Sequence, residues 1–467
     1  MCGILCLIEQ IDVKLLHSIQ HRGQESYGIA YFNNSKLTLH QHKGMINSNT
    51  ITNIQHHINT HKCDIPYIIG HTRYSTSGKK DFDLNQSQPI CGIATINGKQ
   101  EHFILAHNGN IYNKENLHNH FKCSRDSSYT DTQMLVSIIE SFRYDSWKTI
   151  LNTLLNTIPL AYNIIIGTID TVYVMRDSYG IRPLSLGRHD TTNTSYVLCS
   201  ENHMLEEYGF TIQRDIFPGE IISLKIGSPD IHTLNNTITT YSRSYSNSIP
   251  CLFEYIYFLD KSSESDGINT TVFRYNCGKE LAKKDRIIMN EVMSDVIVVG
   301  APETGITSAI GYADELNLNY HQVLIKNNPG RTFILPNDHE RKQACSSKYS
   351  IVSDKVINKS IVIVDDSLVR GNTIKNLIHM FKEKGARKVH VRIVSPPVIS
   401  PCYYGIDIPS HDELIAYNKH INDVNNEIGS HSLMYLDLET IKTEVLIHKN
   451  HCSSCFTGKY NTDILNW

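Results

Sequence analysis

The chain has 467 residues, 40% of them hydrophobic and 19% charged, and its formal net charge is -3. This length predicts two or three domains, and the near balance of charge, without a lysine/arginine block, argues against nucleic acid as a partner. No apolar run approaches the roughly 18 residues of a membrane span, and the Met-Cys start leaves no room for a signal peptide, so we expect a cytoplasmic protein.

The first informative residue is Cys2, which follows the initiator Met1 and precedes Gly3. Removal of Met1 would leave a cysteine with a nucleophilic side chain and an α-amine that titrates at about 7.7 to 8.0, so one residue would supply both nucleophile and base. A buried strand cysteine is the alternative, because free cysteine often packs as a small hydrophobic residue. We expect Met1 removal to be the only maturation step.

Five further segments of the first half form a pattern together with Cys2. They are HRGQESYGI from His21, GHTRYSTSG from Gly70, QSQPI from Gln86, AHNGNIYN from Ala106 and YTDTQML from Tyr129. This set resembles the N-terminal-nucleophile glutamine amidotransferases. The resemblance implies an α+β domain, an αββα sandwich, in which Cys2 attacks the side-chain amide of glutamine and releases ammonia.

The same resemblance gives roles to single residues. Asn108 and Gly109 match the oxyanion hole, whose N–H groups stabilise a tetrahedral intermediate. Arg73 matches the bidentate clamp on the α-carboxylate of glutamine, and Asp131 matches the acceptor of its α-ammonium. Thr76 lies on the loop of Arg73 and matches a further glutamine contact. Taken singly, Arg73 is also typical of a surface ion pair and Asp131 of a helix N-cap.

The periodicity of the first half predicts an antiparallel, sandwich-like sheet. Short alternating segments lie at Tyr162–Ile169, Val172–Met175 and Ile221–Leu224. The polar stretch from Asn235 to Pro250 then breaks the pattern and predicts a linker. We therefore predict a glutaminase domain over residues 2–240.

After the linker, the pattern becomes α/β. Near-continuous apolar runs occur at Val296–Gly300, Ile361–Val364 and Val389–Val394, with helical stretches between them. Such runs are typical of a parallel sheet covered on both faces. We predict a second, α/β domain over residues 251–467.

The most specific string of this half is IVIVDDSLVRGNT, from Ile361 to Thr373, which leads into an amphipathic segment, Ile374–Lys384. A helix beginning near Thr373 would aim free N–H groups at a phosphate, with two acids nearby for sugar hydroxyls or a metal. An ordinary strand-turn-helix is the alternative. The string resembles the phosphoribosyl pyrophosphate (PRPP) loop of type I phosphoribosyltransferases. That resemblance implies Mg²⁺ at Asp365 and Asp366, and PRPP at Asp365, Asp366, Ser367, Arg370, Gly371 and Thr373.

Two other segments extend this resemblance. GAPETG, which ends at Thr304 and Gly305, follows a strand and resembles the pyrophosphate-binding turn, although a plain βα turn is the alternative. Lys326 and Arg331, in IKNNPGRTFILP, resemble the loop that closes over PRPP and excludes water. Gly305 stands where relatives can carry serine, and Thr304 could substitute for it.

In this order, the pieces resemble the amidophosphoribosyltransferases along nearly the whole chain, and CLFEYIYF at Cys251 and RDSYGIRPL at Arg176 are linking matches. The resemblance implies the first committed step of de novo purine synthesis. Glutamine, PRPP and water would give 5-phosphoribosylamine, glutamate and pyrophosphate, with ammonia passed between two active sites. It also implies a homotetramer with purine nucleotides as feedback inhibitors.

Departures from the family pattern define the alternative functions. The closing loop has Asn328 and Pro329 in place of a longer stretch with a tyrosine and a cation, and Ser346 stands where arginine is common. A PRPP- or nucleotide-binding pseudoenzyme or sensor with an impaired closing loop is therefore one alternative. Another amidotransferase, such as glucosamine-6-phosphate or asparagine synthetase, is disfavoured by the PRPP string and by the absence of an S-G-G-x-D-S loop.

Four cysteines resemble the iron–sulfur branch of this family, in which four thiolates hold a [4Fe-4S] cluster. They stand in PCLFEYIYF, PCYYGID and CSSCFTGKY, as Cys251, Cys402, Cys452 and Cys455. A Cys₄ zinc site and unligated thiols are the competing interpretations. A cluster there would be structural or oxygen-sensing and would pin the C-terminal tail to the start of the second domain.

Overall fold

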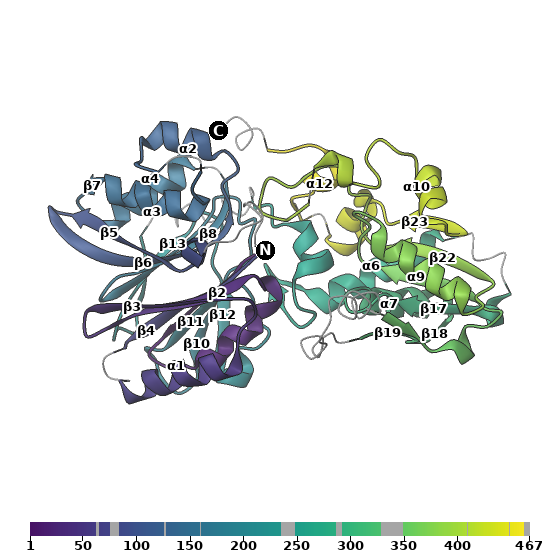
Figure 1. The fold of residues 1–467 in the computed structure, drawn as a ribbon, viewed down its shortest axis with the longest axis horizontal. Helices are drawn as coiled ribbons and strands as arrows, with labels where there is room; N and C mark the ends of the chain where they lie inside the picture. The colour runs from purple at the N-terminus through teal and green to yellow at the C-terminus, as the bar shows by residue number, and fades with distance from the viewer. Residues whose placement is uncertain are drawn as a thin grey trace, which may run out of the picture.

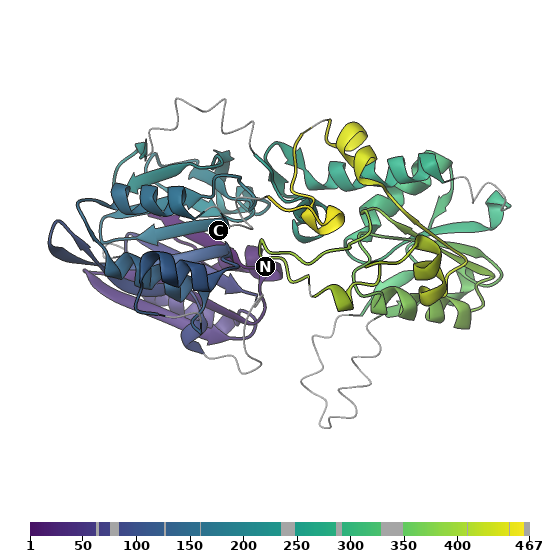
Figure 2. The ribbon, with the colours of Figure 1, turned by 90° about the horizontal axis from the view of Figure 1, so that it is seen from above.

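The structure is a computed structural model, and it describes residues 1–61, 65–74, 84–125, 128–158, 160–234, 248–285, 292–327, 349–408, 410–447 and 449–461. Two lobes lie side by side, and the N-terminus lies where they meet (Figures 1 and 2). In the described part of the chain, no helix combines the length and apolar character that a bilayer crossing requires.

The first lobe contains two seven-stranded sheets. The first has the order β12-β10-β11-β1-β4-β2-β3 and consists of β1 (Gly3–Ile8), β2 (Ser26–Asn33), β3 (Lys36–Lys43), β4 (Tyr67–Arg73), β10 (Ser185–His189), β11 (Tyr196–Cys199) and β12 (Phe210–Asp215). The second has the order β14-β13-β9-β8-β6-β5-β7 and consists of β5 (Ile90–Ile96), β6 (Lys99–Asn110), β7 (Arg143–Tyr144), β8 (Ala161–Gly167), β9 (Thr171–Arg176), β13 (Ile221–Lys225) and β14 (Ile231–Thr233). The predicted antiparallel strands are confirmed.

Helices cover the outer faces of both sheets (Figure 1). The first sheet packs against η1 (Val13–Arg22) and α1 (Ser48–Thr60), and the second against α2 (Lys114–Phe121), α3 (Asp131–Ser141) and α4 (Trp147–Thr157). Strand β1 illustrates why each sheet has one face towards the helices and one towards the other sheet, because successive side chains of a strand point to opposite faces. Ile4 and Cys6 pack between the two sheets, whereas Leu5 and Leu7 pack towards the helices. The predicted αββα sandwich is therefore confirmed.

The second lobe is built on a five-stranded sheet whose neighbouring strands are all parallel. Its order is β18-β17-β21-β22-β23, with β17 (Val296–Gly300), β18 (Asn319–Tyr320), β21 (Ser360–Asp365), β22 (Lys388–Ile393) and β23 (Ser432–Tyr435). In β21, Val362 and Val364 belong to the core that contains α6 (Thr270–Lys284) and α7 (Gly305–Leu316). Ile361 and Ile363 belong to the opposite core, with α9 (Asn372–Glu383) and α10 (Ile421–Ile428). Both faces are covered, as predicted for an α/β lobe.

Short elements complete the second lobe. Two small antiparallel ribbons pair β15 (Glu264–Ser265) with β16 (Ile268–Asn269) and β19 (Leu324–Lys326) with β20 (Tyr349–Ile351). The π-helix η5 (Glu254–Phe258) and the helix α12 (Ser454–Thr457) lie at the junction with the first lobe. Of the predicted linker, residues 235–247 lie outside the described residues. Its end is attached to the first lobe, because the Ile249 N–H donates to the Tyr179 carbonyl (2.9 Å).

A buried ion-pair network joins the two lobes. Arg22 at the end of η1 pairs with Glu201 of its own lobe and with Glu254 of the second lobe, and all three side chains are at most 2% exposed. Glu201 also accepts hydrogen bonds from the Asp260 N–H (2.7 Å) and the Ser263 hydroxyl (2.8 Å) of the second lobe. Burial works to raise the pKa of Glu201, but the charge of Arg22 and the hydrogen bonds outweigh it and hold that pKa well below its usual range.

Replacement of Glu201 by glutamine is expected to lower the free energy of unfolding at pH 7 by about 3 kcal/mol, because it removes one partner of a buried ion pair. Since the folded-state pKa is lowered, the stabilisation is present above the ordinary value of 4.5 and is lost as the pH falls below it. The difference between wild type and variant should therefore shrink below pH 4.5. Urea unfolding across this pH range measures it.

Glu427→Gln is the matched control, because Glu427 is 37% exposed in its ion pair with Lys375. Its loss should cost less than about 1 kcal/mol. Equal effects of the two substitutions, or no dependence on pH for Glu201→Gln, would show that the network does not stabilise the junction of the lobes.

Two candidate active sites

The predicted nucleophile lies directly before β1, between strands β4 and β11. The Cys2 Sγ donates to the carbonyl of Tyr74 (3.6 Å), and the Cys2 carbonyl accepts from the Arg22 Nε (3.1 Å). Next to Arg22, Gly23 packs closely on β4, since a Cβ there would lie 2.5 Å from the Thr72 backbone and 2.6 Å from that of Arg73. The glycine of the HRG string is therefore required by packing.

The surroundings of Cys2 act on the pKa of its thiol in opposite directions. Burial raises the pKa of Cys2, the charge of Arg73 opposes this effect, and that of Asp131 adds to it. These two charges belong to the residues predicted to bind glutamine, so both lie near the sulfur. A protonated thiol is a weak nucleophile, and the site therefore needs a base that accepts its proton.

Asn108 and Gly109 lie near the end of β6. The hydroxyl of Ser200 connects Asn108 to β1, the strand that begins directly after Cys2. The Ser200 Oγ accepts from the Asn108 amide (3.3 Å) and from the Ile4 N–H of β1 (3.0 Å). A Cβ on Gly109 would lie 2.1 Å from the Ala161 carbonyl oxygen, so no other residue fits against β8. Asn108 is thus connected through Ser200 to β1, which follows Cys2 directly.

Arg73 and Asp131 lie at the two sides of this site. Arg73 pairs with Glu25 (Nη1 to Oε2, 2.6 Å), as the ion-pair alternative predicted, but its side chain is buried (6% exposed) and not at the surface. Asp131 is the first residue of α3 and accepts from the Ile111 N–H (3.1 Å). The N-cap of α3 is Thr130, which forms a capping box with Gln133, and the N-cap alternative for Asp131 is therefore also wrong. Thr76 lies outside the described residues.

The two predicted PRPP acids lie at the carboxyl end of the central strand β21, where ligands bind in open α/β sheets. Asp366 is 5% exposed and accepts from the hydroxyls of Thr304 and Ser367. Burial raises the pKa of Asp366, against these hydrogen bonds and the charge of Arg274 on α6. Asp365, half-buried, accepts from the Asp366 N–H (2.9 Å). The Thr304 turn and the two acids therefore form one site.

Two glycines shape the backbone around these acids. A Cβ on Gly305 would lie 2.6 Å from the Val364 carbonyl oxygen, so only glycine lets the turn before α7 pack on β21. Gly371 is the N-cap of α9 with φ +82°, a conformation that favours glycine. These contacts give a packing reason for glycine at both positions.

The remaining predicted PRPP residues lie around this loop at the surface. Arg370 is 48% exposed and pairs with Glu413 (2.7 Å), and Thr373 is exposed in the first turn of α9. Lys326 is exposed on β19, opposite Tyr349 of β20. Arg331, together with Asn328, Pro329 and Ser346, lies outside the described residues.

The four predicted cluster cysteines converge where the C-terminal segment meets the start of the second lobe. Cys251 and Cys452 form a parallel bridge. Burial raises the pKa of the Cys455 thiol, and the charges of Cys402, Cys251 and Cys452 raise it further. Thiols 50 to 200 residues apart in the sequence are therefore close enough to influence one another.

Several residues of these sites were not predicted from the sequence. Glu25 and Tyr74 lie in the quoted HRGQESYGI and GHTRYSTSG strings, but no pattern showed that they pair with Arg73 and Cys2. Ser200 and Arg274 lie outside all the sequence motifs that resemble the family. Their only signal is a polar side chain next to an apolar run, which is too common to identify a site.

Comparisons with known proteins agree with this geometry. The amidophosphoribosyltransferase of Bacillus subtilis is 36% identical over 465 residues, which cover 97% of this chain and 92% of that protein. That of Methanocaldococcus jannaschii is 34% identical (99% and 98% covered), and the human one is 34% identical (97% and 93% covered). The chain belongs to the amidophosphoribosyltransferase family.

Solved structures of family members match both lobes of the chain. The glutamine PRPP amidotransferase from Bacillus subtilis, complexed with ADP and GMP, has a TM-score of 0.82 and 34% identity, with 99% of this chain and 98% of that chain covered. The allosteric regulatory enzyme of purine biosynthesis has a TM-score of 0.83 and 34% identity, with 99% and 97% covered. A family model described as a glutamine amidotransferase domain matches residues 77–207. The predicted family and fold class are confirmed.

Proposed function

We propose that the chain converts glutamine, PRPP and water into 5-phosphoribosylamine, glutamate and pyrophosphate, the first committed step of de novo purine synthesis. The observation that carries this function is the near-complete coverage of relatives named amidophosphoribosyltransferase. It is supported by a half-buried Cys2 directly before β1 in one lobe and two acids at the carboxyl end of a parallel sheet in the other. Nothing in the described residues favours the sensor alternative.

In the first site, Cys2 is the nucleophile and its free α-amine is the base. After loss of Met1, the amine takes the thiol proton, and the sulfur attacks the side-chain amide of glutamine. Asn108 and Gly109 donate to the oxyanion, ammonia departs, and water cleaves the thioester to glutamate. Arg73 holds the α-carboxylate and Asp131 the α-ammonium, which explains why both charges lie near the sulfur.

In the second site, ammonia attacks C1 of PRPP and pyrophosphate departs. The turn at Thr304 and Gly305 receives the pyrophosphate, while Asp365 and Asp366 hold the ribose hydroxyls. Ser367, Arg370, Gly371 and Thr373 bind the 5-phosphate near the N-terminus of α9, where the helix dipole favours an anion. Lys326 and Arg331 act from the closing loop.

Mg²⁺ is the metal that this donor set suits. It is a hard cation that takes oxygen ligands and is commonly bound through one or two carboxylates and substrate phosphates. The Asp365 and Asp366 carboxylates supply such oxygens beside the pyrophosphate turn. Bound there, Mg²⁺ would neutralise charge on the departing pyrophosphate.

We also propose a [4Fe-4S] cluster on Cys251, Cys402, Cys452 and Cys455. The chemistry of four neighbouring thiols suits it. A Cys₄ zinc site would need sulfurs about 3.8 Å apart, from Zn–S bonds of about 2.3 Å. Among the described residues, no group of three or more His, Cys, Asp or Glu side chains is arranged to hold a metal ion, which applies to zinc and to the cluster alike. The cluster would fasten the C-terminal tail to the second lobe.

Protein purified under anaerobic conditions is expected to show the broad visible absorption of an iron–sulfur centre, with about four iron and four sulfide per chain. Cys402→Ser should lower both contents, because it removes one ligand. Cys123→Ser is the control, since Cys123 lies in the first lobe next to Arg125. One zinc per chain, or neither metal nor sulfide, would contradict the cluster.

A blocked N-terminus is expected to eliminate glutaminase activity. With Met1 retained, the Cys2 nitrogen is part of a peptide bond and cannot accept a proton. The α-amine then belongs to Met1, and burial lowers its pKa to about 5. Protein with an uncleavable N-terminal tag should therefore lose glutamine hydrolysis and keep synthesis from ammonium. Full glutaminase activity with the tag confirmed by mass spectrometry would contradict the role of the α-amine.

We further propose feedback inhibition by purine nucleotides, a homotetramer and a cytoplasmic location, and a comparison bears on the first of these. The Bacillus subtilis relative was solved with ADP and GMP.

The test of the function is a stoichiometric assay of purified, Met1-free protein with glutamine and PRPP. It should release one glutamate and one pyrophosphate per turnover. Pyrophosphate release without any nitrogen donor would instead indicate a PRPP hydrolase.

A further inference from the structure

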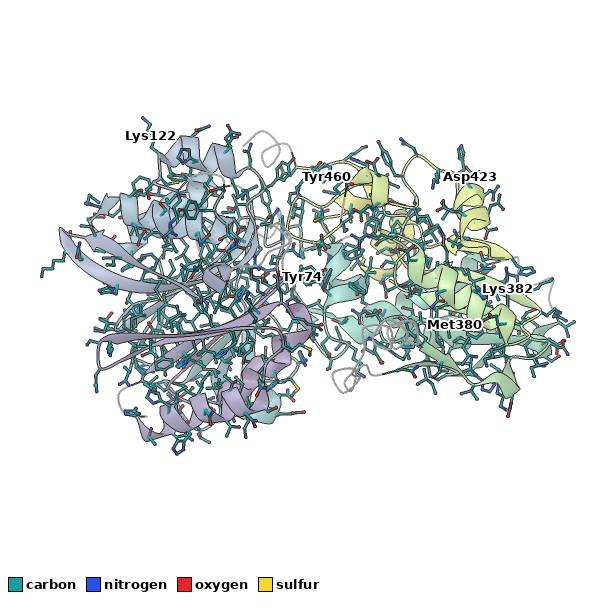
Figure 3. The ribbon with its side chains drawn as sticks, viewed as in Figure 1. Tyr74, Lys122, Met380, Lys382, Asp423 and Tyr460 are labelled. Atoms are coloured by element: carbon teal, nitrogen blue, oxygen red, sulfur yellow. The ribbon has the colours of Figure 1, made fainter. Side chains whose placement is uncertain are left out.

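A segment of the second lobe, Tyr403–Asp407, lies against the candidate glutaminase site. The Tyr403 carbonyl accepts from the Asn110 amide (2.9 Å), at the end of the strand that carries Asn108 and Gly109. Asp407 accepts from the Tyr74 hydroxyl (3.2 Å), and the Tyr74 carbonyl accepts from the Cys2 thiol. Figure 3 shows Tyr74 at the junction of the two lobes.

Gly405 makes the closest approach within this segment. Its φ is +99°, and a Cβ there would lie 3.1 Å from the carbonyl carbon of Gly109 and 3.1 Å from the Cβ of Asn110. It would also lie 2.9 Å from the Arg182 guanidinium. Gly109 is also packed closely on its other side, because a Cβ on it would lie 2.1 Å from the Ala161 carbonyl oxygen of β8. A side chain at Gly405 would therefore press directly on the predicted oxyanion strand.

Arg182 fastens the segment from the first lobe. Its guanidinium is fully buried, donates to the Tyr404 carbonyl and pairs with Glu254 (3.2 Å). Glu254 also pairs with Arg22, whose Nε donates to the Cys2 carbonyl. One buried network thus connects the segment with the backbone of the nucleophile.

We infer that Tyr403–Asp407 is a wall of the glutaminase site and that Gly405 is a positioning residue for its oxyanion hole. The inference rests on the proposed function. It adds that the second lobe, and not only the amidotransferase lobe, sets the geometry at Asn108 and Gly109. Because an oxyanion hole acts on the transition state, displacing it lowers kcat and leaves the KM for glutamine nearly unchanged.

Gly405→Ala is the test, with Gly429→Ala as the matched control. Gly429 lies in the same lobe with φ +74°, but a Cβ there meets only the end of the Lys382 side chain at 3.9 Å. We expect Gly405→Ala to lower the glutamine-dependent kcat about tenfold or more, with the KM for glutamine and the ammonium-dependent rate each within about twofold. Gly429→Ala should leave all three parameters within about twofold of wild type.

Asn110→Ala provides a second variant if Gly405→Ala does not fold, because it removes only the donor to the Tyr403 carbonyl. Asn110→Ala should also lower the glutamine-dependent kcat and leave the ammonium-dependent rate unchanged. Unchanged glutamine kinetics in the folded variants, or equal loss of both activities, would overturn the inference. A wild-type protein inactive with both nitrogen donors would overturn the proposed function instead.

Discussion

Cys2→Ala is expected to lower glutamine-dependent formation of phosphoribosylamine by at least about 10³-fold and to leave ammonium-dependent formation within about twofold. The substitution removes the only group proposed to attack glutamine. Its structural effect should be small, because the one side-chain hydrogen bond of Cys2 among the described residues is weak, 3.6 Å long, to the Tyr74 carbonyl. Pyrophosphate release with each nitrogen donor in turn measures both effects.

Cys91→Ala is the control for this variant, because Cys91 is a half-buried thiol on β5 that takes no part in the proposed chemistry. It should keep both activities. Loss of the ammonium-dependent reaction in folded Cys2→Ala protein would show that the two sites do not divide the chemistry as proposed. Retained glutaminase activity would show that Cys2 is not the nucleophile.

Asp366→Ala is expected to lower both the glutamine-dependent and the ammonium-dependent rates by about 10² to 10³-fold. The carboxylate accepts from Thr304 and Ser367, so its loss leaves two hydroxyls of the pyrophosphate turn and PRPP loop without their acceptor. Each hydroxyl left without its acceptor costs about 1 to 3 kcal/mol, and the proposed contact of Asp366 with the ribose hydroxyls of PRPP is lost as well. Glutamine hydrolysis without PRPP should change far less, because that site lies in the other lobe.

Calorimetric titration with PRPP and Mg²⁺ separates binding from chemistry in this variant. Asp354→Ala, at an exposed acid of the same lobe, should bind PRPP as wild type does. Wild-type affinity for PRPP in Asp366→Ala would contradict the assignment of the loop.

Three strands of each lobe and the α9 helix could be predicted from the sequence because each follows from a local pattern. Ile361–Val364 is apolar at every position because the two faces of β21 pack into different cores. The α9 helix could be placed because Gly371 and a run with helical periodicity adjoin each other. Family motifs located Cys2, Arg73 and Asp131, whose proximity no periodicity could indicate.

The contacts between the lobes could not be predicted, because they join residues far apart in the sequence. Arg22, Arg182 and Glu254 all lie in quoted strings, yet nothing in those strings shows that they share one buried network. Gly405 is similar, since its approach to Gly109 depends on how the second lobe docks. The local sequence shows that a residue is charged or is a glycine, but the residue that it contacts is determined by tertiary packing.

The most direct test of the central claim is pyrophosphate release by Met1-free wild-type protein supplied with PRPP, Mg²⁺ and an ammonium salt as the sole nitrogen donor. The account predicts release that rises with ammonium concentration and requires no glutamine. Absence of PRPP consumption at saturating ammonium, in folded protein with its proposed cofactors bound, would contradict it.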